Sequence, residues 1–130
     1  MNELKVKAHL LTIPRYDIVS STMDAILRVI VSVEDVVLPV VFCNEVATSV
    51  RTLLLELPPE QEIYLSGALR GNSYTDAVGS QNYLLYLMAD NVALTEEELN
   101  TKPRKQYQPL KYDRLPFDVA DLEDILKFME

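Results

Sequence analysis

The chain has 130 residues, which fits one compact domain, and its 48% apolar and 25% charged residues are typical of a globular protein. Its net charge of −8 repels nucleic acid and anionic membranes on average. No apolar run reaches the roughly 18 residues of a membrane-spanning helix, and the first residues lack the layout of a signal peptide. One cysteine and one histidine exclude an internal disulfide and a Cys/His zinc site. We therefore expect a soluble cytoplasmic protein without a metal or cofactor.

The basic residues are unevenly distributed along the chain. Residues 1–94 hold six bases and eleven acids, residues 95–114 hold five bases and four acids, and residues 115–130 hold one base and five acids. A basic segment therefore precedes an acidic C-terminal end. Because the average charge hides this pattern, it does not decide whether the protein binds nucleic acid.

Three strands are predicted in the first 42 residues. Residues 4–10 alternate between apolar and polar, which is the period of a half-buried strand, and Pro14 closes that run or places it at a sheet edge. Residues 25–33 are rich in β-branched side chains and predict a second strand. Residues 36–42 predict a third, which leaves Glu34-Asp35 in a short hairpin connection.

A helix and two further strands are predicted next. Asn44 is a candidate cap for a helix with apolar residues at helical spacing, and Pro58-Pro59 ends it. Residues 63–69 predict a fourth strand, with a bulge or bend at Gly67. Residues 71–80 are polar and turn-rich, which indicates a long exposed hairpin loop. Residues 83–94 predict a fifth strand that is apolar on both faces.

This order of three strands, a helix and two strands is that of an OB-fold barrel, whose helix lies between strands three and four. An immunoglobulin-like sandwich needs about seven strands and no helix, and a doubly wound fold alternates strands and helices. We therefore expect a mainly β chain with a five-stranded OB-fold barrel over residues 1–94. A polar and basic linker over residues 95–116 and a short acidic amphipathic segment over residues 117–130, with Asp118 capping a helix, would follow.

Three segments within residues 36–94 carry a family resemblance. Pro39-Val40-Val41-Phe42 leads directly into a helical segment, residues 45–50, and residues 63–70 read Ile-Tyr-Leu-Ser-Gly-Ala-Leu-Arg. Ser73-Tyr74-Thr75-Asp76, with Gly79 and Tyr83, precedes Ala89-Asp90-Asn91-Val92. In this order the segments resemble the third strand and helix, the fourth strand, the long hairpin and the closing strand of bacterial single-stranded DNA-binding proteins, including their primosomal replication relatives. The resemblance implies sequence-nonspecific binding of single-stranded DNA in replication, repair or recombination, by a homo-oligomer (dimer or tetramer).

The resemblance implies that Phe42 and Tyr74 stack on bases, because they match aromatic positions of the family. Binding a single strand also needs cations that follow the phosphates. The candidates for this role are Arg70, Arg28, Lys5 and Lys7. Each has a structural alternative: Phe42 as a core residue, Tyr74 as a cross-strand partner in the hairpin, and the cations as a solvated outer face. Of Tyr83 and Tyr86, at least one is expected to be buried.

Two C-terminal features suggest further contacts. Residues 102–112 interleave bases with tyrosines, which suits an arm that follows a strand or a linker kept soluble by its charge. The acidic segment places four apolar residues on one helical face: Leu122, Ile125, Leu126 and Met129. That face either docks replication or repair proteins or packs on the protein itself.

Catalysis has no motif in this sequence. No nucleophile signature or glycine-rich phosphate loop is present, and Cys43 is expected to be an inert core thiol. We therefore expect a binding protein rather than an enzyme. The alternative to DNA binding is a protein-interaction module that kept the OB fold and lost the nucleic-acid site.

Overall fold

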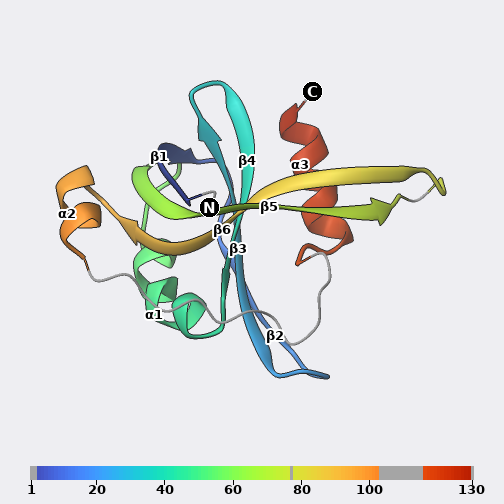
Figure 1. Ribbon diagram of the computed structural model, residues 1–130, viewed down its shortest axis with the longest axis horizontal. Coiled ribbons are helices and arrows are strands. Elements are labelled where there is room, and N and C mark those ends of the chain that lie inside the picture. Colours follow the sequence, from blue (N-terminus) through green and yellow to red (C-terminus); the bar gives the residue numbers. More distant parts are fainter. Residues whose placement is uncertain (1–2, 77, 103–115, 130) are drawn as a thin grey trace.

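The computed structural model describes residues 3–76, 78–102 and 116–129, and these residues are mainly β (Figure 1). The strands are β1 (Glu3–Leu10), β2 (Arg15–Val19), β3 (Asp24–Val33), β4 (Val36–Cys43), β5 (Glu62–Thr75) and β6 (Gln81–Ala93). The helices are α1 (Asn44–Leu55), α2 (Glu96–Thr101) and α3 (Val119–Met129). No helix in the described ranges is long and apolar enough to cross a membrane.

The six strands form one sheet in the order β1-β5-β6-β4-β3-β2. Neighbouring strands are antiparallel except β4 and β6, which run parallel where Val40 and Val41 face Leu87 and Met88. The end of β1 also pairs with β3, since His9 lies opposite Ser32. This extra pairing links the first strand of the order back to the fifth, so the sheet curves around an apolar interior.

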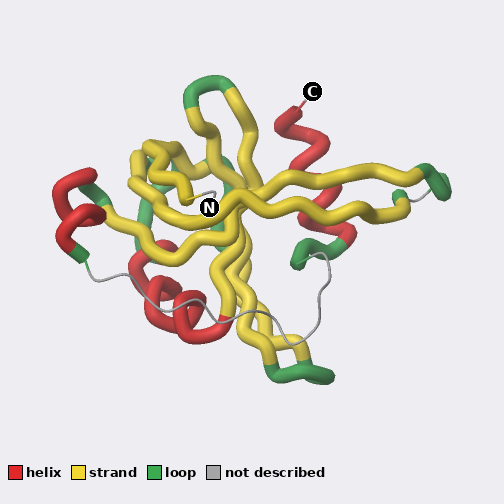
Figure 2. Tube along the Cα trace, viewed as in Figure 1, coloured by secondary structure: helices red, strands yellow, loops and turns green. Residues whose placement is uncertain are grey.

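Two apolar clusters lie on opposite sides of the same strands. The inner cluster includes Leu27, Val29 and Phe42 together with Val46 and Leu54 of α1. The outer cluster joins residues of β3, β4 and β6 to α3 and the residues just before it: Ile26, Ile30, Val41, Cys43, Leu84, Tyr86, Met88, Phe117 and Ile125. Figure 2 shows α3 as the helix beside these strands. Because both faces of β3, β4 and β6 are covered, the sequences of these strands are nearly continuous runs of apolar residues.

The strand count and the position of the helix correct the sequence prediction. The prediction of five strands with the helix after the third is wrong, because β2 is a separate strand and α1 therefore follows β4. The sequence does not predict a strand over residues 15–19, because among the described strands this edge strand pairs with β3 alone and none of its residues is fully buried. The stretch after residue 95 also contains the short helix α2, whose Leu99 is buried.

The β5–β6 hairpin is longer than predicted. Pairing continues to Thr75 opposite Gln81, so most of the expected loop over residues 71–80 is strand. The turn is held by Asp76: its Oδ1 accepts the N–H groups of Val78 and Ser80 at 3.1 and 2.9 Å. The bulge predicted at Gly67 is confirmed by the register shift between Ser66 and Gly67.

The two predicted helix caps have different outcomes. The N-cap position of α1 is Cys43 rather than Asn44, which is the first residue of the helix; the Oδ1 of Asn44 accepts the N–H of Ala25, which ties the start of α1 to β3. Asp118 does cap α3, since its Oδ1 accepts the N–H of Asp121 at 3.0 Å. Asp121 returns the bond by accepting the N–H of Asp118 at 2.9 Å, which is the reciprocal arrangement of a capping box.

Candidate nucleic-acid interface

The outer face of β1 and β5 brings two predicted phosphate contacts together. Lys5 and Lys7 are exposed on β1, while the alternating residues Leu4 and Val6 pack against the inner cluster. Across the ladder, Lys5 lies opposite Ser66 and Lys7 lies opposite Tyr64. Directly paired residues project from the same face of a sheet, so both lysines share the outer face with Tyr64.

This outer face continues along the whole length of β5. The extra residue of the bulge belongs to β6, where Ser66 and Gly67 pair with Asn91 and Ala89. Alternation along β5 is therefore unbroken, and Arg70 and Tyr74 project to the same side as Tyr64. We call the residues Lys5, Lys7, Tyr64, Arg70 and Tyr74 the β5 track. From Tyr64 to Tyr74 the strand advances about 33 Å, at about 3.3 Å per residue.

The lysines of the track have weak partners. Lys7 Nζ lies 3.6 Å from Glu62 Oε2, and His9 Nε2 lies 3.5 Å from the same oxygen. Lys5 Nζ donates to Asn100 Oδ1 of α2 at 2.9 Å, across a groove that Tyr64 also lines. The exposed ion pair of Lys7 contributes at most about 1 kcal/mol, and the partner of Lys5 is an exposed neutral amide, so a phosphate can replace both at low cost.

Phe42 is not available to a base in this structure. Its side chain is 0% exposed and belongs to the inner cluster, where it faces Leu27 across the β3–β4 ladder. A stacking aromatic must present one open ring face. The position of Phe42 therefore fits the structural alternative of a core residue.

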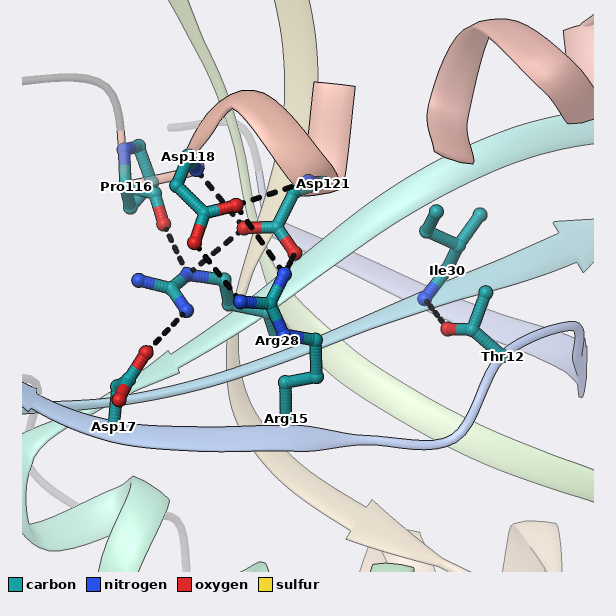
Figure 3. Close-up of polar contacts among 8 residues, drawn as sticks. All are labelled: Thr12, Arg15, Asp17, Arg28, Ile30, Pro116, Asp118 and Asp121. Carbon is teal, nitrogen blue, oxygen red and sulfur yellow. Dashed lines mark hydrogen bonds and ion pairs between the residues drawn. The ribbon is translucent and has the colours of Figure 1, made fainter. Parts of the chain in front are cut away.

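Arg28 is also withdrawn from solvent, in a cluster of charges at the start of α3 (Figure 3). It projects outward from β3 but is only 8% exposed. Its Nε donates to the carbonyl oxygen of Pro116 at 2.8 Å and lies 3.2 Å from Asp121 Oδ2, and its Nη1 donates to Asp17 Oδ2 at 3.2 Å. These acceptors take the place that a phosphate would need.

Arg15, which is not among the predicted phosphate contacts, completes this cluster. It is the cross-strand partner of Arg28, and its Nη1 and Nη2 donate to Asp121 Oδ1 and Asp118 Oδ2 at 2.6 and 2.9 Å. The hydrogen bond from Arg15 lowers the pKa of Asp118, whereas burial raises the pKa of Asp121. The sequence feature that points to this cluster is the pair Asp118 and Asp121. Two carboxylates three residues apart at a helix start can cap the helix and still accept hydrogen bonds from a cation.

The predicted stacking residue Tyr74 lies where the hairpin meets α3. It is half-buried, packs against the outer cluster, and lines a groove with Leu122 and Leu126. Of the four predicted partner-binding residues, Ile125 is buried in the outer cluster and Leu122 packs against it, whereas Leu126 and Met129 are exposed. The apolar face of α3 is thus divided between the protein's own sheet and solvent.

The two tyrosines of β6 have opposite environments. Tyr86 is buried, with its ring edge-to-face on Phe117 at a centroid distance of 5.3 Å, and its hydroxyl donates to Asn72 Oδ1 at 2.5 Å. Tyr83 is 66% exposed and its ring lies over Gly71. Tyr83 pairs with Ser73, so it projects from the face opposite Tyr74 and lies off the β5 track.

The predicted basic arm, residues 102–112, lies outside the described residues except for Lys102. The Nζ of Lys102 donates to the carbonyl oxygen of Val92 at 3.1 Å, which fastens the end of α2 to β6.

The fold is similar to solved structures of SSB domains. The SSB domain of a Synechococcus sp. protein matches with a TM-score of 0.56 and 19% identity, over 71% of this chain and 93% of that one. The second single-stranded DNA-binding protein (SSBb) of Mycobacterium smegmatis matches with a TM-score of 0.58 and 15% identity, over 84% of this chain and 100% of that one. No protein-family model and no curated protein matches the sequence. The chain therefore has the OB fold of SSB domains, as the resemblance predicted.

Proposed function

We propose that this protein binds single-stranded DNA without sequence preference, along the β5 track. The observation that carries the proposal is that Lys5 and Lys7 of β1 share the outer face of the sheet with Tyr64, Arg70 and Tyr74 of the neighbouring strand β5, in an SSB-like fold. Cations spaced along a strand with aromatic rings between them are what sequence-tolerant binding requires. We further propose a role in replication, repair or recombination, and a homo-oligomeric state.

Two of the six residues suggested by the sequence are left out of this site. Phe42 is in the core, and Arg28 is held by Asp17 and Asp121. These two observations favour a second candidate function, a protein-interaction OB module without nucleic-acid binding. The net charge of −8 supports the same alternative.

The two functions are separated by the salt dependence of binding to a fluorescent oligo-dT, followed by anisotropy. If the track binds phosphates, affinity falls steeply with salt, and the variant Lys5→Gln/Lys7→Gln lowers the slope of log K against log salt by about 1.4, because each phosphate contact to a single strand contributes about 0.7. The control Arg51→Gln/Lys127→Gln removes the same charge from exposed positions of α1 and α3. Its slope should equal that of the unmodified protein. Absence of binding at low salt would favour the interaction module.

A further inference from the structure

A groove lies between the tip of the β5–β6 hairpin and α3. Eight residues line this hairpin–α3 groove: Tyr74, Thr75, Asp76, Val78, Asn82, Leu122, Glu123 and Leu126. The half-buried side chains of Tyr74 and Leu122 pack against the outer cluster, so the groove rests on the folded core. Figure 1 shows the hairpin and α3 lying beside each other.

The hairpin side of the groove is held in place before anything binds. Asp76 Oδ2 accepts a hydrogen bond from Asn82 Nδ2 at 2.7 Å, and its Oδ1 accepts the N–H groups of Val78 and Ser80. This bonded turn presents Val78 with 86% of its surface exposed. A preformed wall lowers the ordering cost that a binding partner must overcome.

The helix side of the groove adds exposed apolar surface. Leu126 is 56% exposed, and Met129, three residues further along the same face of α3, is also exposed. Apolar side chains grouped at one place on a surface mark contact sites more often than isolated ones do. The groove therefore offers an apolar contact between two elements that are far apart in the sequence.

The charge around the groove is negative. Asp76 and Glu123 line it, and within the described part of the chain no lysine or arginine does. Hydrogen bonds from the Ser80 N–H and from the Asn82 side chain lower the pKa of Asp76, because they stabilise its ionised carboxylate. These carboxylates repel the phosphates of nucleic acid and attract cationic side chains.

We propose that the hairpin–α3 groove binds a segment of a partner protein in which a bulky apolar side chain is flanked by lysine or arginine. The apolar side chain lies between Val78 and Leu126, over Tyr74, and the flanking cations meet Asp76 and Glu123. A second copy of this chain is a poorer occupant, because its own groove and α3 carry the same negative charge. The groove shares Tyr74 with the β5 track but includes neither its lysines nor Arg70, so binding of the peptide does not depend on DNA binding.

The test uses the full chain and a synthetic peptide, acetyl-Lys-Leu-Leu-Lys-Lys-Leu-amide, followed by NMR of isotope-labelled protein. We expect saturable shifts at Val78, Leu122 and Leu126. A peptide with glutamate in place of each lysine, and one with serine in place of each leucine, should not shift these signals. Shifts spread over the surface, or the same shifts from the glutamate peptide, would overturn the proposal.

Two variants locate the contact. Leu126→Asn should weaken binding of the peptide about ten-fold or more, since it removes a leucine that the complex buries. Leu55→Asn is the matched control, because Leu55 is 45% exposed on α1 and lies outside the groove. Equal affinity of the two variants would contradict the proposed contact.

Two alternative occupants of the hairpin–α3 groove would give results that differ from those expected for the peptide. If oligo-dT rather than the peptide shifts the groove signals, the groove is a nucleic-acid subsite and the proposal is wrong. If sedimentation shows self-association that Leu126→Asn abolishes and the peptide does not bind, the occupant is a second copy and the proposal is also wrong. Binding of oligo-dT through Lys5 and Lys7 is measured separately, so failure of the proposed function leaves this test intact.

Discussion

The Nε of Arg28 lies 3.2 Å from Oδ2 of Asp121, and both side chains are more than nine-tenths buried. This ion pair joins the third strand to the first turn of the last helix. Removing one partner of a buried pair leaves an uncompensated charge in the interior, which is costly. The contact therefore couples the position of α3 to the integrity of the sheet.

Replacing Arg28 should destabilise the protein strongly. Arg28→Met removes one of the two arginines that contact Asp121 and takes away the Nε donor to the carbonyl of Pro116, so we expect a loss of about 3 kcal/mol in the free energy of unfolding by urea. Arg51→Met, on α1, is the control: it removes the contact of an exposed guanidinium that lies 4.0 Å from the centroid of the Tyr16 ring, and should cost under about 1 kcal/mol. Equal losses of stability in the two variants would show that the buried ion pair contributes no more than an exposed arginine does.

The charge of Asp118 should stabilise α3 in a pH-dependent way. Its pKa is lowered in the folded state, so the stabilisation is present above the ordinary value of 3.8, begins to decrease below it, and is lost as the pH falls through the lowered pKa of the folded protein. Asp118→Asn keeps a capping oxygen and removes the charge, and should cost about 0.5–1 kcal/mol at pH 6 because the pair with Arg15 is partly exposed. The difference between the two proteins in urea unfolding should shrink toward pH 3. A difference that does not change with pH would exclude the charge as its cause.

The thiol of Cys43 should report whether α3 covers the sheet. Burial raises the pKa of Cys43 to about 12, so thiol reagents should react with it slowly at pH 8. Ile125→Ala should cost about 2–3 kcal/mol by leaving a cavity in the outer cluster that holds Cys43, and should speed labelling. Leu126→Ala, at the neighbouring exposed position, should change neither quantity appreciably. Fast labelling of the unmodified protein would contradict the buried environment.

Two glycines on β5 should differ in their tolerance of alanine. A Cβ at Gly67 would collide with the backbone of Met88 and Ala89, whereas the three atoms nearest to one at Gly71 all belong to the exposed side chain of Tyr83. We expect Gly67→Ala to cost about 2–3 kcal/mol and Gly71→Ala less than about 1 kcal/mol, because a side chain moves more easily than a strand. Thermal unfolding of both variants measures this order, and the reverse order would refute it.

The two hairpin tyrosines should differ in DNA binding if the β5 track is the site. Tyr74→Leu keeps an apolar side chain against Leu122 and removes the ring, and should weaken binding of oligo-dT by about 1–3 kcal/mol. Tyr83→Leu, on the opposite face, should leave the affinity unchanged. Anisotropy titrations at one salt concentration compare the two, and an effect of Tyr83→Leu alone would move the site to the other face of the hairpin.

Local patterns in the sequence were sufficient for most of the elements. Alternation over residues 4–10 predicted β1 with Lys5 and Lys7 on one face, and Gly67 predicted the bulge. Asp118 predicted the start of α3, because a capping residue acts on its own first turn. The edge strand β2 was missed since an exposed strand with one neighbour carries little apolar periodicity.

The family resemblance predicted the fold correctly, but the site residues that it suggested lie in different environments. Tyr74 and Arg70 lie on the outer face of β5, where their contact with DNA stays a prediction, while Phe42 lies in the core and Arg28 lies beneath the start of α3. An apolar strand such as β4 buries residues on both faces, so its sequence does not show which aromatic has an open side.

The sequence by itself determined the two faces of β1 and the capping of α3, because each depends on residues within a few positions of one another. The tertiary structure alone decided that α3 covers the outer face of β3, β4 and β6, and that Asp121 reaches Arg15 and Arg28. Burial and ion pairing depend on which distant segment docks on a surface, and no local periodicity records that choice. For this reason Arg28 reads as a surface cation in the sequence and is a buried partner of α3 in the fold.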